Sequence, residues 1–236
     1  MKNESPILIT GCARSGTSMV AGIINTCGAW GGKLISPSNY NQKGFFENVV
    51  IRNKICKPFL ESIGVDTKGQ DPLPDMERIK SISNIPHFIT TWRIKVLDEI
   101  KKQSYSEGSW YYKGAKMCLM WPIWNLAFPD AKWIIVRRDK DDIISSCMKT
   151  GFMSAFHTRE GWAKWVDFHL ARFDEMKENC SYVYEIYPQQ IINGNFESIK
   201  TLINILGLSW DKEKVVEFVA PALWSNFIKG ENYGKS

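Results

Sequence analysis

The stretch Gly11-Cys12-Ala13-Arg14-Ser15-Gly16-Thr17-Ser18 decides the fold, because it joins a short apolar run to a longer apolar pattern. Residues 6–11 before it, Pro-Ile-Leu-Ile-Thr-Gly, predict a buried strand, and residues 17–27 predict a helix. A loop between a strand and a helix N-terminus presents consecutive backbone N–H groups, which can bind phosphate oxygens. Residues 11–18 therefore predict a phosphate-binding loop.

This loop differs from the P-loop of nucleoside triphosphatases in the place of its cation. That motif requires lysine where this chain has Thr17, and the positive charge lies instead on Arg14, inside the loop. No apolar strand ends in an aspartate suited to Mg²⁺, since residues 132–136 are followed by two arginines. An arginine can donate two hydrogen bonds to an oxygen that gains charge when a terminal group departs. The pattern argues against an ATPase or kinase, although a kinase-like phosphotransferase remains an alternative.

Length and composition favour one domain over residues 1–236. The chain is 44% hydrophobic and 23% charged, which excludes disorder, collagen and coiled coil. Its start is polar and no apolar run approaches the roughly 20 residues of a membrane span, so we expect no signal peptide and no membrane anchor. Six scattered cysteines without a Cys-x-x-Cys pair indicate reduced thiols, a cytoplasmic protein and no bound metal. The net charge of +5 suits an anionic small ligand as well as nucleic acid, but no basic and aromatic array indicates a nucleic-acid partner.

Apolar periodicity predicts alternating strands and helices along the rest of the chain. Such alternation is typical of an α/β fold of three layers, with a central parallel sheet flanked by helices. Two loops rich in glycine, serine, asparagine or proline, residues 29–44 and 64–86, are candidates for the wall that binds an acceptor. The predicted strands are residues 110–112, 132–136 and 182–184, and the predicted helices are residues 45–63, 87–103, 122–128, 140–149, 159–178, 195–206 and 211–219.

A second anion site is predicted after the strand at residues 132–136. In an open parallel sheet, ligands bind at the carboxyl ends of the strands, so this strand can face the phosphate loop. Arg138 follows it and Ser146 lies eight residues later; Arg137 and Ser145 have the same spacing, but the aspartate after Arg138 favours the first pair. The motif spans residues 137–146.

With both motifs in place, the sequence resembles the sulfotransferases that use 3′-phosphoadenosine 5′-phosphosulfate (PAPS), of the bacterial and tyrosylprotein type. Their 5′-phosphosulfate loop, Pro-Lys/Arg-Ser-Gly-Thr-Thr/Ser, is matched by residues 13–18 except for the proline. Their 3′-phosphate motif, Arg-Asp/Asn-Pro-x-Asp-x-x-x-Ser, is matched by residues 138–146 with Lys140 in place of proline. Three further segments follow the family order: Gly44-Phe-Phe-Glu47, Trp110-Tyr-Tyr-Lys113-Gly-Ala-Lys116, and Tyr184-Glu185 followed by Leu206-Gly-Leu208.

The resemblance implies a metal-independent transfer of a sulfuryl group from PAPS to a hydroxyl or amine, leaving adenosine 3′,5′-bisphosphate (PAP). It implies donor binding by the residues Arg14, Ser15, Gly16, Thr17, Ser18, Arg138, Ser146 and Tyr184. Arg14 and Lys113 would stabilise the charge that develops during transfer, and Glu47 would be the base that deprotonates the acceptor. A small molecule, a carbohydrate or a peptide are all compatible acceptors.

Two departures from the family pattern keep other interpretations open. Lys113-Gly-Ala replaces Lys-Asp-Pro, so a nucleotide-binding pseudoenzyme without turnover is an alternative. The adenine loop has only Phe227-Ile-Lys229-Gly230 as a counterpart. His87, His157 and His169 are other candidates for the base, although His169 falls on an apolar stripe that predicts packing in the core.

Overall fold

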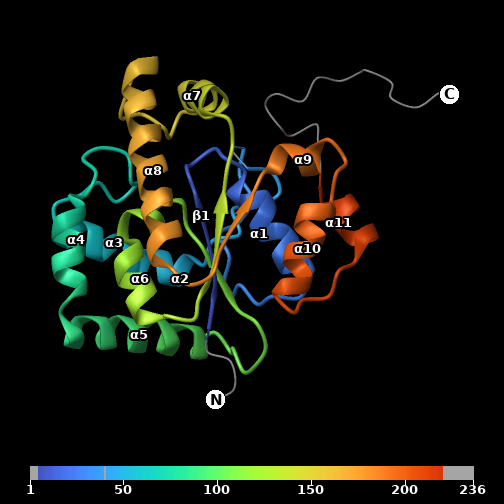
Figure 1. Cartoon of the computed structure of the whole chain (residues 1–236), viewed down its shortest axis with the longest axis horizontal. Helices are drawn as coiled ribbons and strands as arrows, with labels where there is room; N and C mark the ends of the chain where they lie inside the picture. The colour runs from blue at the N-terminus through green and yellow to red at the C-terminus, as the bar shows by residue number, and fades with distance from the viewer. Residues whose placement is uncertain (1–4, 40, 220–236) are drawn as a thin grey trace.

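A parallel sheet of four strands forms the centre of the computed structural model, which describes residues 5–39 and 41–219. The strands are β1 (Ile7–Gly11), β2 (Tyr111–Lys113), β3 (Lys132–Val136) and β4 (Val183–Ile186). Their order is β2-β1-β3-β4, and Ile9 of β1 pairs with Lys113 on one side and Ile134 on the other. The predicted parallel sheet is confirmed, and the predicted phosphate loop, residues 11–18, follows β1, one of the two inner strands (Figure 1).

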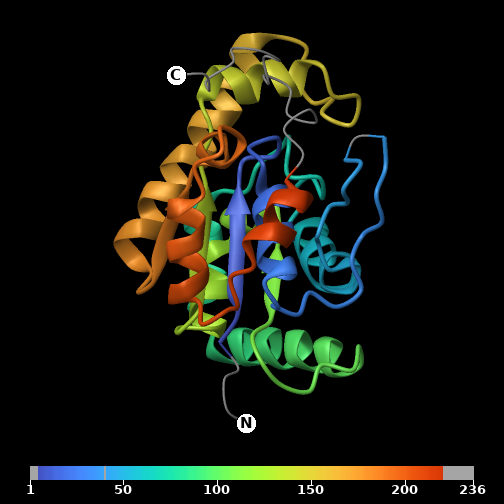
Figure 2. The same ribbon diagram turned by 90° about the vertical axis from the view of Figure 1, so that its right-hand side faces the viewer.

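Helices cover both faces of this sheet, as the alternating pattern predicts (Figures 1 and 2). Among the described residues, none of them is both long enough and apolar enough to cross a membrane. The helical segments are α1 (Thr17–Thr26), α2 (Val49–Ile51), the π turn η1 (Arg52–Cys56), α3 (Lys57–Ser62), α4 (Met76–Ser83), α5 (Pro86–Lys101), the 3₁₀ segment η2 (Ala115–Met120), α6 (Trp121–Ala127), α7 (Lys140–Met148), α8 (Arg159–Asn179), α9 (Pro188–Ile192), α10 (Glu197–Ile205) and α11 (Lys212–Phe218).

The alternation of side chains along each strand divides the core into two clusters. Leu8, Tyr112 and Trp133 point to the face covered by α3 to α6 and α8, where Tyr112 stacks on Trp124 at 5.2 Å between ring centroids. Ile9 and Ile134 point to the opposite face, which α1, α10 and α11 cover. Burial of apolar surface on both faces is the main term that stabilises such a sheet.

Three segments differ from the sequence-based expectation. The helix expected from residue 45 begins at Val49, because the Asn48 side chain accepts hydrogen bonds from the N–H groups of Val50 and Ile51 and caps the first turn. Residues 76–83, expected to be part of a loop, form α4, whose first turn is capped by Asp75. The short helix α9 was not predicted.

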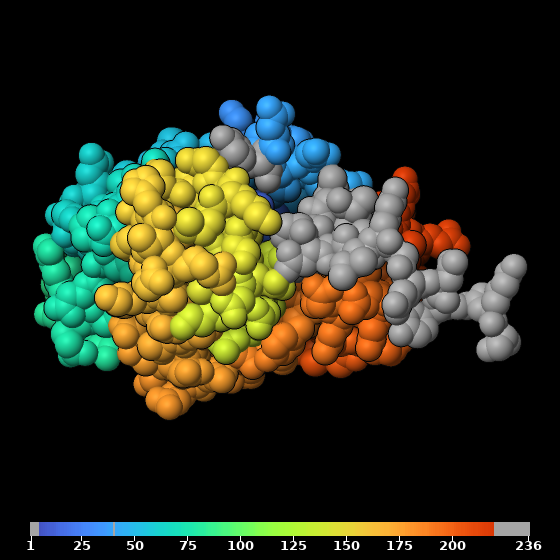
Figure 3. Space-filling view, turned by 90° about the horizontal axis from the view of Figure 1, so that it is seen from above, coloured from blue at the N-terminus to red at the C-terminus, as the bar shows by residue number. Residues whose placement is uncertain are grey.

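The carboxyl ends of the strands and the loops that follow them form one end of the molecule, seen from above in Figure 3. Residues 140–158, in yellow, lie beside the teal segment of residues 64–85 on this face (Figure 3). Gln70 joins the two segments: its amide donates to the Phe152 carbonyl at 2.8 Å and accepts from the N–H groups of Ser154 and Ala155. The candidate acceptor loop is thereby fixed to the loop after α7.

Candidate functional site

The phosphate loop follows β1 and ends in the first turn of α1. Arg14 and Gly16 have positive φ angles of 72° and 95°, and the Ser15 N–H donates to the Cys12 carbonyl at 3.1 Å, so the chain turns sharply before α1. The Ser15 hydroxyl is buried and makes no hydrogen bond among the described residues, and no side chain caps α1 there. A buried donor without a partner is costly in a folded chain, so these groups fit a bound anion.

Gly11 is required by the close packing beneath this loop. A Cβ atom at this position would lie 2.6 Å from the Val136 carbonyl oxygen and 2.8 Å from the Ser15 hydroxyl. Thr17 is buried beside it, while Ser18 is half-buried in the first turn of α1. The loop can therefore approach β3 closely only because residue 11 has no side chain.

Arg14 lies at the centre of a network that reaches α7. Its Nε donates to the Ser146 hydroxyl at 3.0 Å, and Arg138 donates from Nη1 to the Arg14 carbonyl at 2.9 Å. Asp142 lies 3.7 Å from Arg138 Nε. Burial lowers the pKa of both guanidinium groups, yet an arginine does not lose its proton in a protein. Two fixed positive charges therefore stand side by side above the strand ends.

The neighbouring pair, Arg137 and Ser145, points elsewhere. Arg137 lies 3.4 Å from the Glu185 carboxylate and over the Phe173 ring, at 5.5 Å from its centroid. The Ser145 hydroxyl accepts a hydrogen bond from Arg159 at 3.2 Å. Of the two registers that the sequence left open, only Arg138 with Ser146 reaches the phosphate loop.

Glu47 and Lys113 come together on the other side of the loop. Lys113 ends β2 and is 5% exposed, and Glu47, just before the Asn48 cap, is 8% exposed. Burial lowers the pKa of Lys113, while the Glu47 carboxylate nearby raises it. One Glu47 oxygen lies 3.8 Å from Arg52 Nε and makes no hydrogen bond among the described residues. A carboxylate and an ammonium group are thus both largely out of water, within range of electrostatic interaction.

The other predicted residues do not reach this site. Tyr184 pairs in register with Ile134, two residues below the end of its strand, and packs into the core cluster under α10. His169 is buried against Trp165, and His87 and His157 are exposed on the surface. Residues 227–230, the candidate adenine loop, lie outside the described residues.

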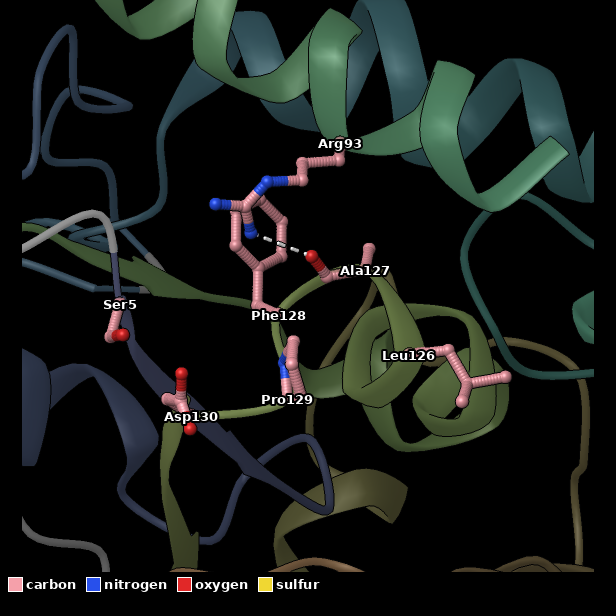
Figure 4. A pocket seen from close by; sticks show the side chains of 7 residues that line it. All are labelled: Ser5, Arg93, Leu126, Ala127, Phe128, Pro129 and Asp130. Carbon is pink, nitrogen blue, oxygen red and sulfur yellow. Dashed lines mark hydrogen bonds between the residues drawn. The ribbon is translucent and has the colours of Figure 1, made fainter. Parts of the chain in front are cut away.

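A metal centre and a cavity are two other kinds of place where a ligand can bind. Among the described residues, no group of three or more histidine, cysteine or acidic side chains could hold a metal ion. A cavity of about 330 Å³ lies at the opposite end of the sheet, where Arg93 packs over Phe128 (Figure 4). It contains none of the residues that the motifs single out.

The sequence motifs overlooked Arg52 and Lys57. Their spacing of five residues puts them on different sides of an α-helix, so no pattern groups them with Glu47. The π turn η1 changes the rotation between these two side chains, and no sequence signature predicts such a turn.

Comparison with known proteins identifies the family of this chain. A model of the sulfotransferase family matches residues 6–212. The chain belongs to the sulfotransferase family. Comparison with curated protein sequences finds no match.

Two solved structures are similar to this sulfotransferase, one of them closely enough to compare the fold. The sulfotransferase domain of the Synechococcus PCC 7002 olefin synthase superposes with a TM-score of 0.54 at 11% identity, over 100% of this chain and 92% of that one. Sulfotransferase STF1 of Mycobacterium tuberculosis H37Rv has a TM-score of 0.47 at 14% identity, over 91% of this chain and 70% of that one. At such low identity the first similarity supports the α/β fold alone.

Proposed function

We propose that this sulfotransferase moves a sulfuryl group from PAPS to a hydroxyl or amine acceptor, without a metal. The observation that carries the proposal is the network of Arg14, Arg138 and Ser146. It joins a loop suited to a 5′-phosphosulfate to a second cation and hydroxyl suited to a 3′-phosphate. A donor with phosphates at both positions would engage both halves, whereas ATP would leave the second half without a ligand.

The residues around the loop have separate tasks in this reaction. The bond between the acceptor oxygen and sulfur forms as the bond between sulfur and the phosphate oxygen breaks, so negative charge grows on the leaving phosphate. Arg14, Lys113 and the loop N–H groups would neutralise that charge. Glu47 would take the proton of the acceptor. The buried positions of Glu47 and Lys113 support these roles, because charges interact more strongly where water is excluded.

The acceptor would enter between the segments 29–44 and 64–86. The second of these contains α4 and is tied to the loop after α7 through Gln70, so it would form a preorganised wall. A kinase-like activity is disfavoured by Thr17 in the lysine position of the loop. The alternative is a pseudoenzyme that binds the donor without turnover, and experiment must distinguish it from an active enzyme.

Calorimetric titration of PAP, AMP and Mg-ATP tests this proposal. We expect PAP to bind most tightly of the three, without metal. Arg138→Ala should lower the affinity for PAP at least tenfold and the affinity for AMP by less than about threefold, since a hydrogen bond to a charged group contributes about 1.5–3 kcal/mol. Arg159→Ala is the matched control, because Arg159 binds Asp141 at the surface of the same region. Transfer of labelled sulfate from PAPS then separates an enzyme from a pseudoenzyme. Preference for Mg-ATP, or equal affinity for PAP and AMP, would contradict the proposal.

A further inference from the structure

A π turn places two cations on one side of the helical segment that follows Glu47. The Lys57 N–H donates to the Arg52 carbonyl, five residues earlier, which closes the π turn η1. In an α-helix, residues five apart would be rotated by about 140°. The wider π turn reduces this rotation and brings Arg52 and Lys57 toward the same side. Burial, followed by the charge of Arg52, lowers the pKa of Lys57.

A third cation, Lys116, reaches the same place from η2. It is 8% exposed and makes no hydrogen bond or ion pair among the described residues. It is close enough to lower the pKa of both Lys57 and Lys113. The candidate acceptor loop packs directly on it, since a Cβ atom on Gly69 would lie 3.1 Å from its Cβ atom.

Positive charge at this place exceeds negative charge. Arg52 Nε lies 3.8 Å from a Glu47 carboxylate oxygen. Burial lowers the pKa of Lys57 and of Lys113, and the Glu47 carboxylate opposes this at both lysines, as Asp66 does at Lys57. The two Asp66 oxygens already accept hydrogen bonds from the N–H groups of Lys68 and Gln70. Within the described part of the chain, neither Lys57 nor Lys113 forms an ion pair. Lys113 and Lys116 are buried, and like charges held together away from water destabilise a fold unless an anion joins them.

The donor accounts for only part of this charge. In the proposed function, Lys113 and Arg14 face the phosphosulfate. Arg52 lies instead beside Glu47, Lys57 follows it in the same helical segment, and Lys116 packs against the loop that contains Gly69. That is the acceptor side.

We infer that the acceptor carries an acidic group, a carboxylate, sulfate ester or phosphate ester, and that Arg52, Lys57 and Lys116 bind it. This inference rests on the proposed function and names the class of its acceptor. The bound anion would hold the neighbouring hydroxyl against Glu47, so the same cluster would select the acceptor and orient it. A neutral alcohol would leave the three cations without a partner and would therefore bind weakly.

Sulfate titration of the protein saturated with PAP tests the inference, with inorganic sulfate as the probe for the acidic group. Chloride at equal ionic strength corrects for screening. The variants are Lys57→Gln and Lys116→Gln. Lys54→Gln is the matched control, because Lys54 lies in the same π turn but forms an ion pair with Glu99 at 3.1 Å. Lys57 is only partly buried, so its variant is expected to fold even if Lys116→Gln does not.

We expect sulfate to bind beside PAP, with its affinity at least tenfold weaker in Lys57→Gln and unchanged in Lys54→Gln, while all variants bind PAP alike. Absence of sulfate binding below about 100 mM would overturn the inference. A tenfold loss of PAP affinity in Lys57→Gln would overturn it as well, because the cluster would then serve the donor. If PAP itself fails to bind, the proposed function is refuted. Sulfate binding to the free protein that depends on Lys57 but not on Arg138 would in that case still support the anion site.

Discussion

His169 makes the free energy of unfolding depend on pH in a way that can be worked out from the structure. The imidazole is 1% exposed, its Nδ1 lies 2.8 Å from the Trp165 carbonyl oxygen, and its ring centroid lies 4.0 Å from that of Trp165. Burial, opposed by the Trp165 carbonyl and assisted by the charge of Arg172, lowers its pKa to about 4. An unfolded chain restores the ordinary pKa of about 6.5.

The sign follows from which state binds the proton. Above pH 6.5 the imidazole is neutral in both states, so its titration contributes nothing. Between pH 6.5 and 4 the unfolded chain takes up a proton that the folded chain does not, so the folded state loses stability as the pH falls. From pH 7.5 to 4.5 this loss amounts to about 2.5 kcal/mol.

Urea unfolding followed by tryptophan fluorescence measures this effect. His169→Leu removes the titrating group, so we expect its free energy of unfolding to fall by about 2.5 kcal/mol less than that of the wild type over this pH range. Any constant offset between the two proteins reports packing alone. His157→Leu, at an exposed position, is the control and should follow the wild type. Parallel curves for the wild type and His169→Leu would refute the reasoning.

Three further substitutions test other parts of the structure. Gly11→Ala places a Cβ atom 2.6 Å from the Val136 carbonyl oxygen. We therefore expect the free energy of unfolding, measured with urea, to fall by about 2 kcal/mol, and the affinity for PAP, measured by calorimetry, to fall at least tenfold. Asn48→Ala removes the cap of α2 and should lower the free energy of unfolding by about 1–2 kcal/mol, whereas Asn53→Ala, at an exposed position, should change it by less than about 0.5 kcal/mol. Gln70→Leu leaves two N–H groups and a carbonyl without partners, so we expect the free energy of unfolding to fall by about 2–4 kcal/mol and proteolysis at residues 149–157 to become faster. An unchanged digestion pattern would contradict the bridging role of Gln70.

The sheet could be predicted from the sequence because its signals are local. Short apolar runs bounded by glycine or charged residues mark β1 and β3, and the glycines and Arg14 mark the loop between β1 and α1. The helix α4 did carry a signal, Asp75 before apolar residues at helical spacing, but the prolines and glycines before it favoured a loop.

The candidate site could be predicted only in part, because its parts meet through tertiary packing. The spacing of eight residues fits Arg137 with Ser145 as well as Arg138 with Ser146, and only the fold turns one arginine toward Glu185 and the other toward Arg14. The π turn that groups Arg52 with Lys57 depends in the same way on what the segment packs against. Patterns within one segment do not contain that information.

The central position of β1 in the sheet has a consequence for synthesis on the ribosome. β1 and the loop after it emerge well before their partners: Ser146 is 132 residues from Arg14, and Arg138 is 124 residues from it. Until β2 and β3 have been translated, the apolar side chains of β1 have no neighbouring strand and can associate with other nascent chains. A ribosome-bound chain that ends before residue 146 therefore cannot complete the network around Arg14, and a chaperone that shields its first strand would raise the yield of folded protein.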